Sequence, residues 1–442
     1  MHLADVGQAE LEGVQDGEHV LLWDYIAEAD KYCLRPSQLA PWRKRADPLA
    51  DDAVEALDLK PGMDALAAIE KALEGEIPPT AVVRFWDHVL TPPPPGVSAF
   101  APDQDPKSLQ DTSPEAALRH PTRRPPPTCE FGFLSCHRSA HLDLGMTCLI
   151  RAVMLEVHDL REGGGGTDMS RAVAQGQAVF WRYSTYCFEA FMHFSLAGGF
   201  GSPRLAATMR ETGYLTSSNR DATYRRLLET TLFILDAMSD FRIGVGKGWK
   251  STLRVRLLHA QVRRRIRQGM GIAKEYDPET LGLPINQEDM SATLGAFAVA
   301  PLWSMRRVGL RLTREEQAAY VATWRHLGHM LGIEEDILRT YYGTLSGAEK
   351  FFASVAFDLF PAIVPEDPYQ TPTYKMLSAV SNRPPRTSNV REQLHYTVLL
   401  AEPLVTGYPA PRMLATAAGR SPRRPAAHPA RHVARQSPAS GQ

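Results

Sequence analysis

This chain of 442 residues lacks the features that mark several large classes of protein. Its five cysteines are too few and too irregularly spaced for a disulfide framework, which favours a reduced, cytoplasmic compartment. No segment approaches the roughly 18 apolar residues that span a bilayer, and no basic-then-apolar signal opens the sequence, so a soluble protein is predicted. A net charge of -1 gives no electrostatic reason to expect a nucleic acid partner.

Several catalytic signatures are absent as well. The sequence contains no phosphate-binding Walker loop, no G-x-G-x-x-G, no G-x-S-x-G and no H-E-x-x-H. One group of metal-ligating residue types occurs, at Cys129, Cys136, His137, His141 and Cys148. Its spacing matches no common zinc template and its flanks are rich in proline, so we do not expect zinc there.

What remains is ordinary globular composition, with 44% apolar and 22% charged residues. Residues 1–90 are predicted to be a helical region that packs on the core, and residues 168–400 to be the main folded domain. Between them, 91–167 reads as a Pro/Gly-rich insertion or linker, with eleven prolines from Pro92 to Pro127. Residues 401–442 read as a disordered basic tail.

Helical periodicity dominates the ordered-looking chain and no alternating strand pattern recurs, so an all-α, multi-helix bundle is predicted. Thr313 and Glu316 form a capping box at the start of the last of the central helices, and Gly332 ends it. Asn286 is expected to cap the helix before it. The predicted helices cover 64–74, 173–197, 222–238, 250–268, 287–304 and 314–331.

His259 is the first candidate for chemistry. It is the only ionisable member of an apolar stripe on the predicted helix 250–268, formed by Thr252, Val255, His259, Val262 and Ile266. A neutral imidazole in apolar surroundings is a good iron ligand. A buried histidine satisfied by hydrogen bonds would produce the same pattern, and for one helix alone that is the more frequent explanation.

The predicted helix 222–238 carries a second candidate set. Arg226 and Thr230 lie one turn apart beside apolar neighbours, a pairing that suits recognition of a carboxylate or of bound dioxygen. Glu229 lies three residues from Arg226, so an ordinary ion pair within the helix is the competing interpretation.

Six segments, taken in order, resemble the catalytic domain of the rubber oxygenases (latex clearing proteins) and of the ER-bound oxygenase of mycophenolic acid synthesis. They are GQAVFWRY (176–183), TGYL (212–215), RRLLETTLF (225–233), GWKSTLRVRLLHAQVRRRI (248–266), GLPINQEDMSATLGAF (282–297) and WRHLGHMLGIEEDIL (324–338).

The resemblance implies a globin-like helical core around one haem b, with His259 as the iron ligand. It implies that Arg226 and Thr230 contact the cofactor or serve catalysis, and that Glu211 or Glu229 acts as a catalytic base. One residue departs from the pattern. Rubber-cleaving members carry lysine immediately before the threonine, and this chain has Glu229, so an amine cannot cover the iron.

The predicted function is therefore a haem-dependent enzyme that uses dioxygen to oxidise or cleave an isoprenoid-like or other apolar unsaturated substrate. Polymeric rubber is a poor candidate, because this chain lacks both that lysine and a visible secretion signal. Two alternatives remain open: a non-catalytic haem- or lipid-binding helical protein, and a helical scaffold whose basic tail docks to an acidic partner or membrane surface. Should His259 not hold the iron, His193, His326 and His329 are next.

Overall fold

The computed structural model describes residues 11–22, 25–94, 110–111, 168–213, 219–359, 372–383 and 388–401. Nearly all of the linker predicted at 91–167 and of the tail predicted at 401–442 lies outside these residues, as does the group of Cys129, Cys136, His137, His141 and Cys148. Helices make up nearly all of the regular structure that is described, so the predicted all-α class is confirmed.

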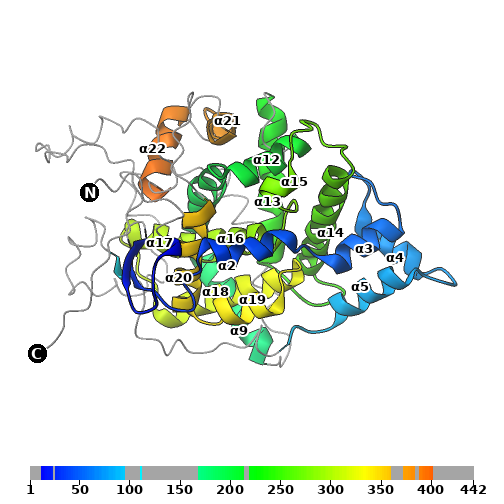
Figure 1. Ribbon diagram of the computed structural model, residues 1–442, viewed down its shortest axis with the longest axis horizontal. Coiled ribbons are helices and arrows are strands. Elements are labelled where there is room, and N and C mark those ends of the chain that lie inside the picture. The colour runs from blue at the N-terminus through cyan, green and yellow to red at the C-terminus, as the bar shows by residue number, and fades with distance from the viewer. Residues whose placement is uncertain are drawn as a thin grey trace, which may run out of the picture.

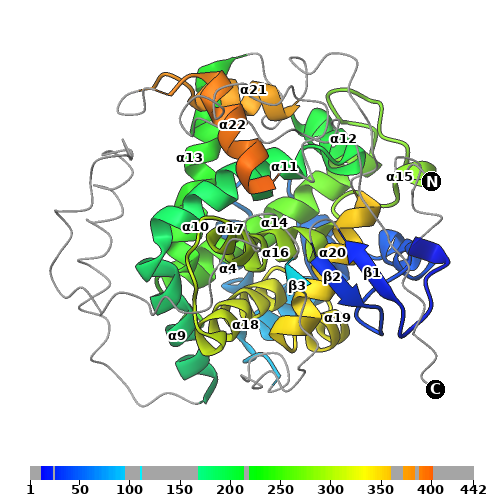
Figure 2. The ribbon, with the colours of Figure 1, turned by 90° about the vertical axis from the view of Figure 1, so that its left-hand side faces the viewer.

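A small antiparallel sheet was not predicted. Strands β1 (His19–Leu22) and β2 (Tyr25–Glu28) form a hairpin in which His19 pairs with Glu28. The two-residue β3 (Gln110–Asp111) joins the far edge of β2. The hairpin lies beside α19 (Glu335–Tyr341) and α20 (Leu345–Leu359), on the edge of the helical body (Figure 2). Strands this short carry too little alternation to stand out in a sequence.

The main hydrophobic core lies where α16 (Gln287–Ala298), α17 (Ala300–Arg307) and α20 meet α18 (Arg314–Met330). Helix α9 (Asp168–Arg182) packs along α18 at close range, because a Cβ added to Gly176 would lie 2.0 Å from Thr323 Oγ1. Phe191, Phe297 and Trp324 fill the centre with tilted and edge-on ring contacts. Within the described residues, no helix combines the length and the apolar character needed to cross a membrane.

The amino-terminal helices form a second core at one end of the molecule (Figure 1). Helices α3 (Pro48–Ala56), α4 (Ala65–Leu73) and α5 (Thr80–Leu90) pack against one face of α14 (Lys247–Arg267). That face of α14 presents Trp249, Leu253, Leu257 and Ala260, all of them buried. The helix that carries His259 is therefore enclosed from the amino-terminal side.

Two predicted helices are interrupted. The segment 173–197 divides into α9, α10 (Ser184–Ala190), the π-helical turn η4 (Phe191–Leu196) and α11 (Ala197–Gly199). The segment 287–304 breaks at Val299, because Pro301 has no amide hydrogen to continue the ladder of α16.

The other predicted helices are confirmed within a few residues. The capping box of Thr313 and Glu316 is present, and Gly332 adopts a left-handed φ of +88° just after α18. The Asn286 side chain accepts from the Asp289 amide at 2.9 Å, as predicted for a cap.

A buried network of charges joins four separate elements. Glu288 and Asp289 on α16 pair with Arg204, which lies at the start of α12 (Pro203–Thr212). Arg43, in the 3-10 helix η2 (Ala40–Lys44), bridges Glu288 to Asp358 on α20. Three buried carboxylates thus share two partly buried guanidinium groups, and burial raises the pKa of Asp289 to about 7 and that of Asp358 to about 6.

The remaining described segments complete the fold around these cores. They are α2 (Pro36–Leu39), α13 (Arg220–Ala237), the short α15 (Pro278–Leu281), α21 (Pro372–Val380) and α22 (Val390–Ala401). Helices α21 and α22 pack against each other, and α21 also covers α13. Both carboxy-terminal helices lie at the same end of the molecule as α12 (Figure 1).

Gly248→Ala is expected to destabilise the protein by about 1–3 kcal/mol, the usual cost of overpacking. The glycine lies where α14 begins against the end of α13, and an added Cβ would meet the Asp236 carbonyl oxygen at 2.5 Å. Chemical denaturation measures the loss. Gly199→Ala is the matched control, since its Cβ would meet nothing within 4 Å. Equal stability of the two variants would contradict the close crossing.

Candidate functional site

Four of the residues predicted to carry chemistry, all except Glu211, lie on a helical hairpin. Helices α13 and α14 pack against each other and are joined by a tight connection. The Asp240 carbonyl accepts from the Gly248 amide at 2.9 Å. Only a glycine fits at position 246, because an added Cβ would lie 2.5 Å from the Asp240 carbonyl oxygen. The glycines at the start of α14 therefore determine how the two helices face each other.

His259 lies in the middle of α14 with its side chain partly buried. Its Nδ1 is out of solvent and has no hydrogen-bond partner among the described residues. Burial, reinforced by the Arg263 charge, lowers the pKa of His259 to about 4, while the Asp47 carboxylate opposes the shift. The imidazole is neutral at neutral pH as a result, with a ring nitrogen left unsatisfied.

Two buried arginines flank His259 on the same helix. Arg256 donates to Asp47 through Nε at 2.7 Å and through Nη2 at 3.0 Å. Arg263 donates to Asp51 through Nε at 2.8 Å. The arginine side chains are only 2% and 1% exposed. These two arginines are therefore buried in ion pairs and are not part of a solvated face.

Arg226 and Glu229 form an ion pair with each other on the outer side of α13. Arg226 Nη1 donates to Glu229 Oε2 at 2.9 Å, and the side chains are 56% and 59% exposed. The Thr230 hydroxyl donates to the Arg226 carbonyl at 3.1 Å, within the same helix turn. This geometry is the ordinary intrahelical pair that the sequence left open as the competing interpretation.

Glu211 is buried at the end of α12, and its carboxylate is engaged by the main chain. Its two oxygens accept from the amides of Lys274 and Glu275 at 2.9 and 2.7 Å. Gly271 passes so close that an added Cβ would lie 1.9 Å from Glu211 Oε2. In this structure the side chain holds the loop that follows α14 through these two hydrogen bonds.

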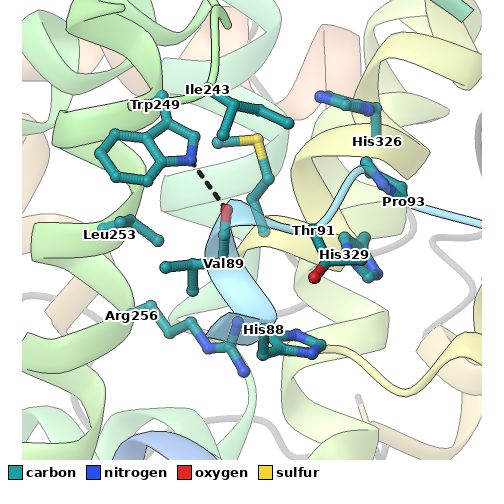
Figure 3. A pocket seen from close by; sticks show the side chains of 11 residues that line it. His88, Val89, Thr91, Pro93, Ile243, Trp249, Leu253, Arg256, His326 and His329 are labelled. Atoms are coloured by element: carbon teal, nitrogen blue, oxygen red, sulfur yellow. Dashed lines mark hydrogen bonds between the residues drawn. The ribbon is translucent and has the colours of Figure 1, made fainter. Parts of the chain in front are cut away.

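A small cavity, open to solvent on one side, holds a second group of imidazoles. His88 from α5 and His329 from α18 lie with ring centroids 5.4 Å apart, and His326 lines the same wall (Figure 3). Arg256 borders the cavity beside His88, and the Trp249 indole donates to the Val89 carbonyl at 3.2 Å. Burial is the first cause that lowers the pKa of His326 to about 4 and of His329 to about 3.

This cavity was not predicted from the sequence. The spacing of His326 and His329, three apart on one helix, was a usable signal. Nothing in the sequence indicated that α5, more than 230 positions earlier, would bring His88 to the same place. His193, another candidate, lies elsewhere, on the π-helical turn with Nδ1 2.8 Å from Thr397 Oγ1.

The donor chemistry of His259 fits a haem iron. A neutral, desolvated imidazole is the form that binds metal, and the unsatisfied Nδ1 is the kind of orphaned polar atom that an absent group explains. Among the described residues, no cluster of three or more histidine, cysteine or carboxylate side chains could hold a metal ion.

Comparison with known proteins gives one family and one structure. The sequence profile of the "ER-bound oxygenase mpaB/B'/Rubber oxygenase, catalytic domain" matches residues 181–437. A structure of latex clearing protein LCP in the closed state aligns over 84% of this chain and 86% of that chain, with 15% identity and a TM-score of 0.44. No curated protein sequence matches.

Proposed function

Because this chain belongs to the family of ER-bound oxygenase and rubber oxygenase catalytic domains, we propose that it is a haem b-dependent oxygenase of an apolar unsaturated molecule. The observation that carries the proposal is His259, a neutral imidazole with an unsatisfied Nδ1. It lies inside the matched segment, on a helix that two buried ion pairs hold in place.

A bound haem supplies an iron centre that activates dioxygen. The protein's part is to present one neutral imidazole and to keep that side chain in place. His259 stays unprotonated at neutral pH because burial lowers its pKa, so no proton competes with metal at the ring. Arg256 and Arg263 fix the helix on either side of it. Arg226 and Thr230, one helix away, are proposed to orient oxygen or a propionate.

The proposed base is a carboxylate that takes an allylic proton from the substrate. Glu211 fits this role less well, because both of its carboxylate oxygens are already engaged by main-chain amides of the loop after α14. Glu229 is bound only to another side chain in the contacts described above, and it can turn from Arg226 toward a substrate. A substrate that covers α13 would also exclude water from Glu229. An exposed carboxylate needs that exclusion to abstract a proton from carbon.

Oxygen uptake with isoprenoids of graded length tests the function. Wild-type protein loaded with haem is expected to consume oxygen with a short polyene such as squalene and to yield oxidised or cleaved products. Haem binding without oxygen uptake across the whole series would favour the alternative of a non-catalytic haem- or lipid-binding protein. Purified protein without haem would favour a helical scaffold.

Glu229→Gln is expected to lower turnover at least tenfold, within the range for loss of a general base. The free energy of unfolding should change little, because an exposed ion pair within one helix contributes about 0.2–0.5 kcal/mol. Glu335→Gln is the matched control, since it breaks the exposed Arg339–Glu335 pair at 2.8 Å on α19. Turnover equal to wild type in both variants would remove Glu229 from the mechanism.

A further inference from the structure

The two buried ion pairs beside His259 are made with a single helix. Asp47 and Asp51 are four residues apart at the start of α3, and their partners lie at positions three before and four after His259. His259 and its neighbour Ala260 therefore lie on α14 within one turn of both pairs. Helix α3 packs against α14, so the two pairs fix the backbone of α14 on either side of the histidine.

Such pairs are costly to make and are poor devices for stability alone. Moving a guanidinium and a carboxylate out of water costs several kcal/mol for each ion, and buried pairs often contribute no net stability. Asp47 is 3% exposed, like its partner Arg256 at 2%. What a fixed, buried pair does provide is a defined charge at a defined place.

The position of Asp47 is determined from three sides. Its carboxylate accepts two hydrogen bonds from Arg256 and also caps α3 at the Ala50 amide. On the third side lies Gly332, the left-handed residue after α18, where an added Cβ would meet Asp47 Oδ2 at 2.3 Å. These contacts hold the carboxylate between α14, its own helix and the end of α18.

We propose that Asp47 and Asp51 are positioning residues for the haem ligand, which hold α14 at His259 and set the charge that the iron feels. The proposal rests on the proposed function. Asp47 and Arg263 are also the two charged groups that act on the His259 imidazole. Both aspartates precede the segment 181–437, so this support comes from outside the part of the chain that matches the family.

The direction of the effect follows from electrostatics. A fixed carboxylate near the ligating imidazole would favour the oxidised iron, which carries one more positive charge, and would so lower the reduction potential. Removing that charge while leaving Arg256 in place should raise the potential and weaken the hold on haem. Partners of metal ligands typically change affinity by roughly 10–100-fold when removed.

The test measures haem dissociation and the midpoint potential of purified holoprotein. Asp47→Asn keeps the size and the helix cap and removes the charge. We expect haem to dissociate roughly tenfold faster or more and the potential to rise. In the double variant Asp47→Asn with Arg256→Gln, which restores neutrality, the potential should return most of the way to the wild-type value.

Asp58→Asn is the control. It breaks an ion pair with Arg264, which also lies on α14, but Asp58 is 66% exposed. If Asp47→Asn fails to fold, Asp51→Asn should shift the potential in the same direction. Unchanged dissociation and potential in the aspartate variants, or equal shifts in Asp58→Asn, would overturn the proposal while the haem function stands. Wild-type protein that binds no haem would overturn both.

Discussion

His259→Ala is expected to abolish stoichiometric haem binding and to leave the helical signal in far-ultraviolet circular dichroism largely intact. The imidazole is the proposed iron ligand, and without a protein ligand to its iron a haem would be held only by weaker contacts. The fold should survive, because the described structure gives Nδ1 no hydrogen bond that the substitution could break. Absorbance of the Soret band per mole of chain is the measurement.

His326→Ala and His329→Ala are the controls, because these imidazoles are also buried and have lowered pKa values. Both variants are expected to keep a full complement of haem. A full Soret band in His259→Ala, with its loss in either control, would move the iron to the cavity between α5, α14 and α18.

Asp289→Asn is expected to become progressively more stable than wild type as the pH rises from 5 to 8. Burial raises the pKa of Asp289 to about 7, and the Glu288 charge adds to the shift against the opposing pull of Arg204. The folded protein therefore binds this proton more tightly than the unfolded chain does. The stability that this group contributes is full at acid pH and is lost as the pH rises through about 7.

The asparagine is neutral throughout, so the difference in unfolding free energy between variant and wild type should change by an amount on the order of a few kcal/mol. The buried histidines have lowered pKa values, so their protonation destabilises the folded protein at low pH instead. This contribution is the same in variant and wild type, and it cancels in the difference. Denaturant titrations at four pH values give the result. Asp336→Asn, on the exposed side of α19, should show no such trend. A constant difference for Asp289→Asn would contradict the raised pKa.

Much of the helical framework was predictable because its signals are local. The cap at Thr313, the left-handed Gly332 and the stripe through His259 depend on residues within one or two turns of each other. The same local signals did not reveal where two of the predicted helices are interrupted. The break at Val299 required weighing Pro301 against a run of apolar residues, and the π-helical turn at 191–196 has no simple sequence marker.

The site was less predictable because its decisive contacts join distant parts of the chain. A row of arginines on α14 gives no sign that Arg256 and Arg263 will be buried against Asp47 and Asp51. Periodicity could place Arg226 and Glu229 on one helix turn, and either a pair or a catalytic role satisfied that spacing. The choice of His259 came from the family resemblance, since a buried core histidine gives the same stripe.

The visible absorption spectrum of the purified wild-type protein, expressed with sufficient haem, tests the central claim most directly. We predict a Soret band, a b-type haemochrome in pyridine, and one haem for each chain. Folded protein that carries no haem, and that does not reach a 1:1 end point when titrated with haemin, would contradict the account.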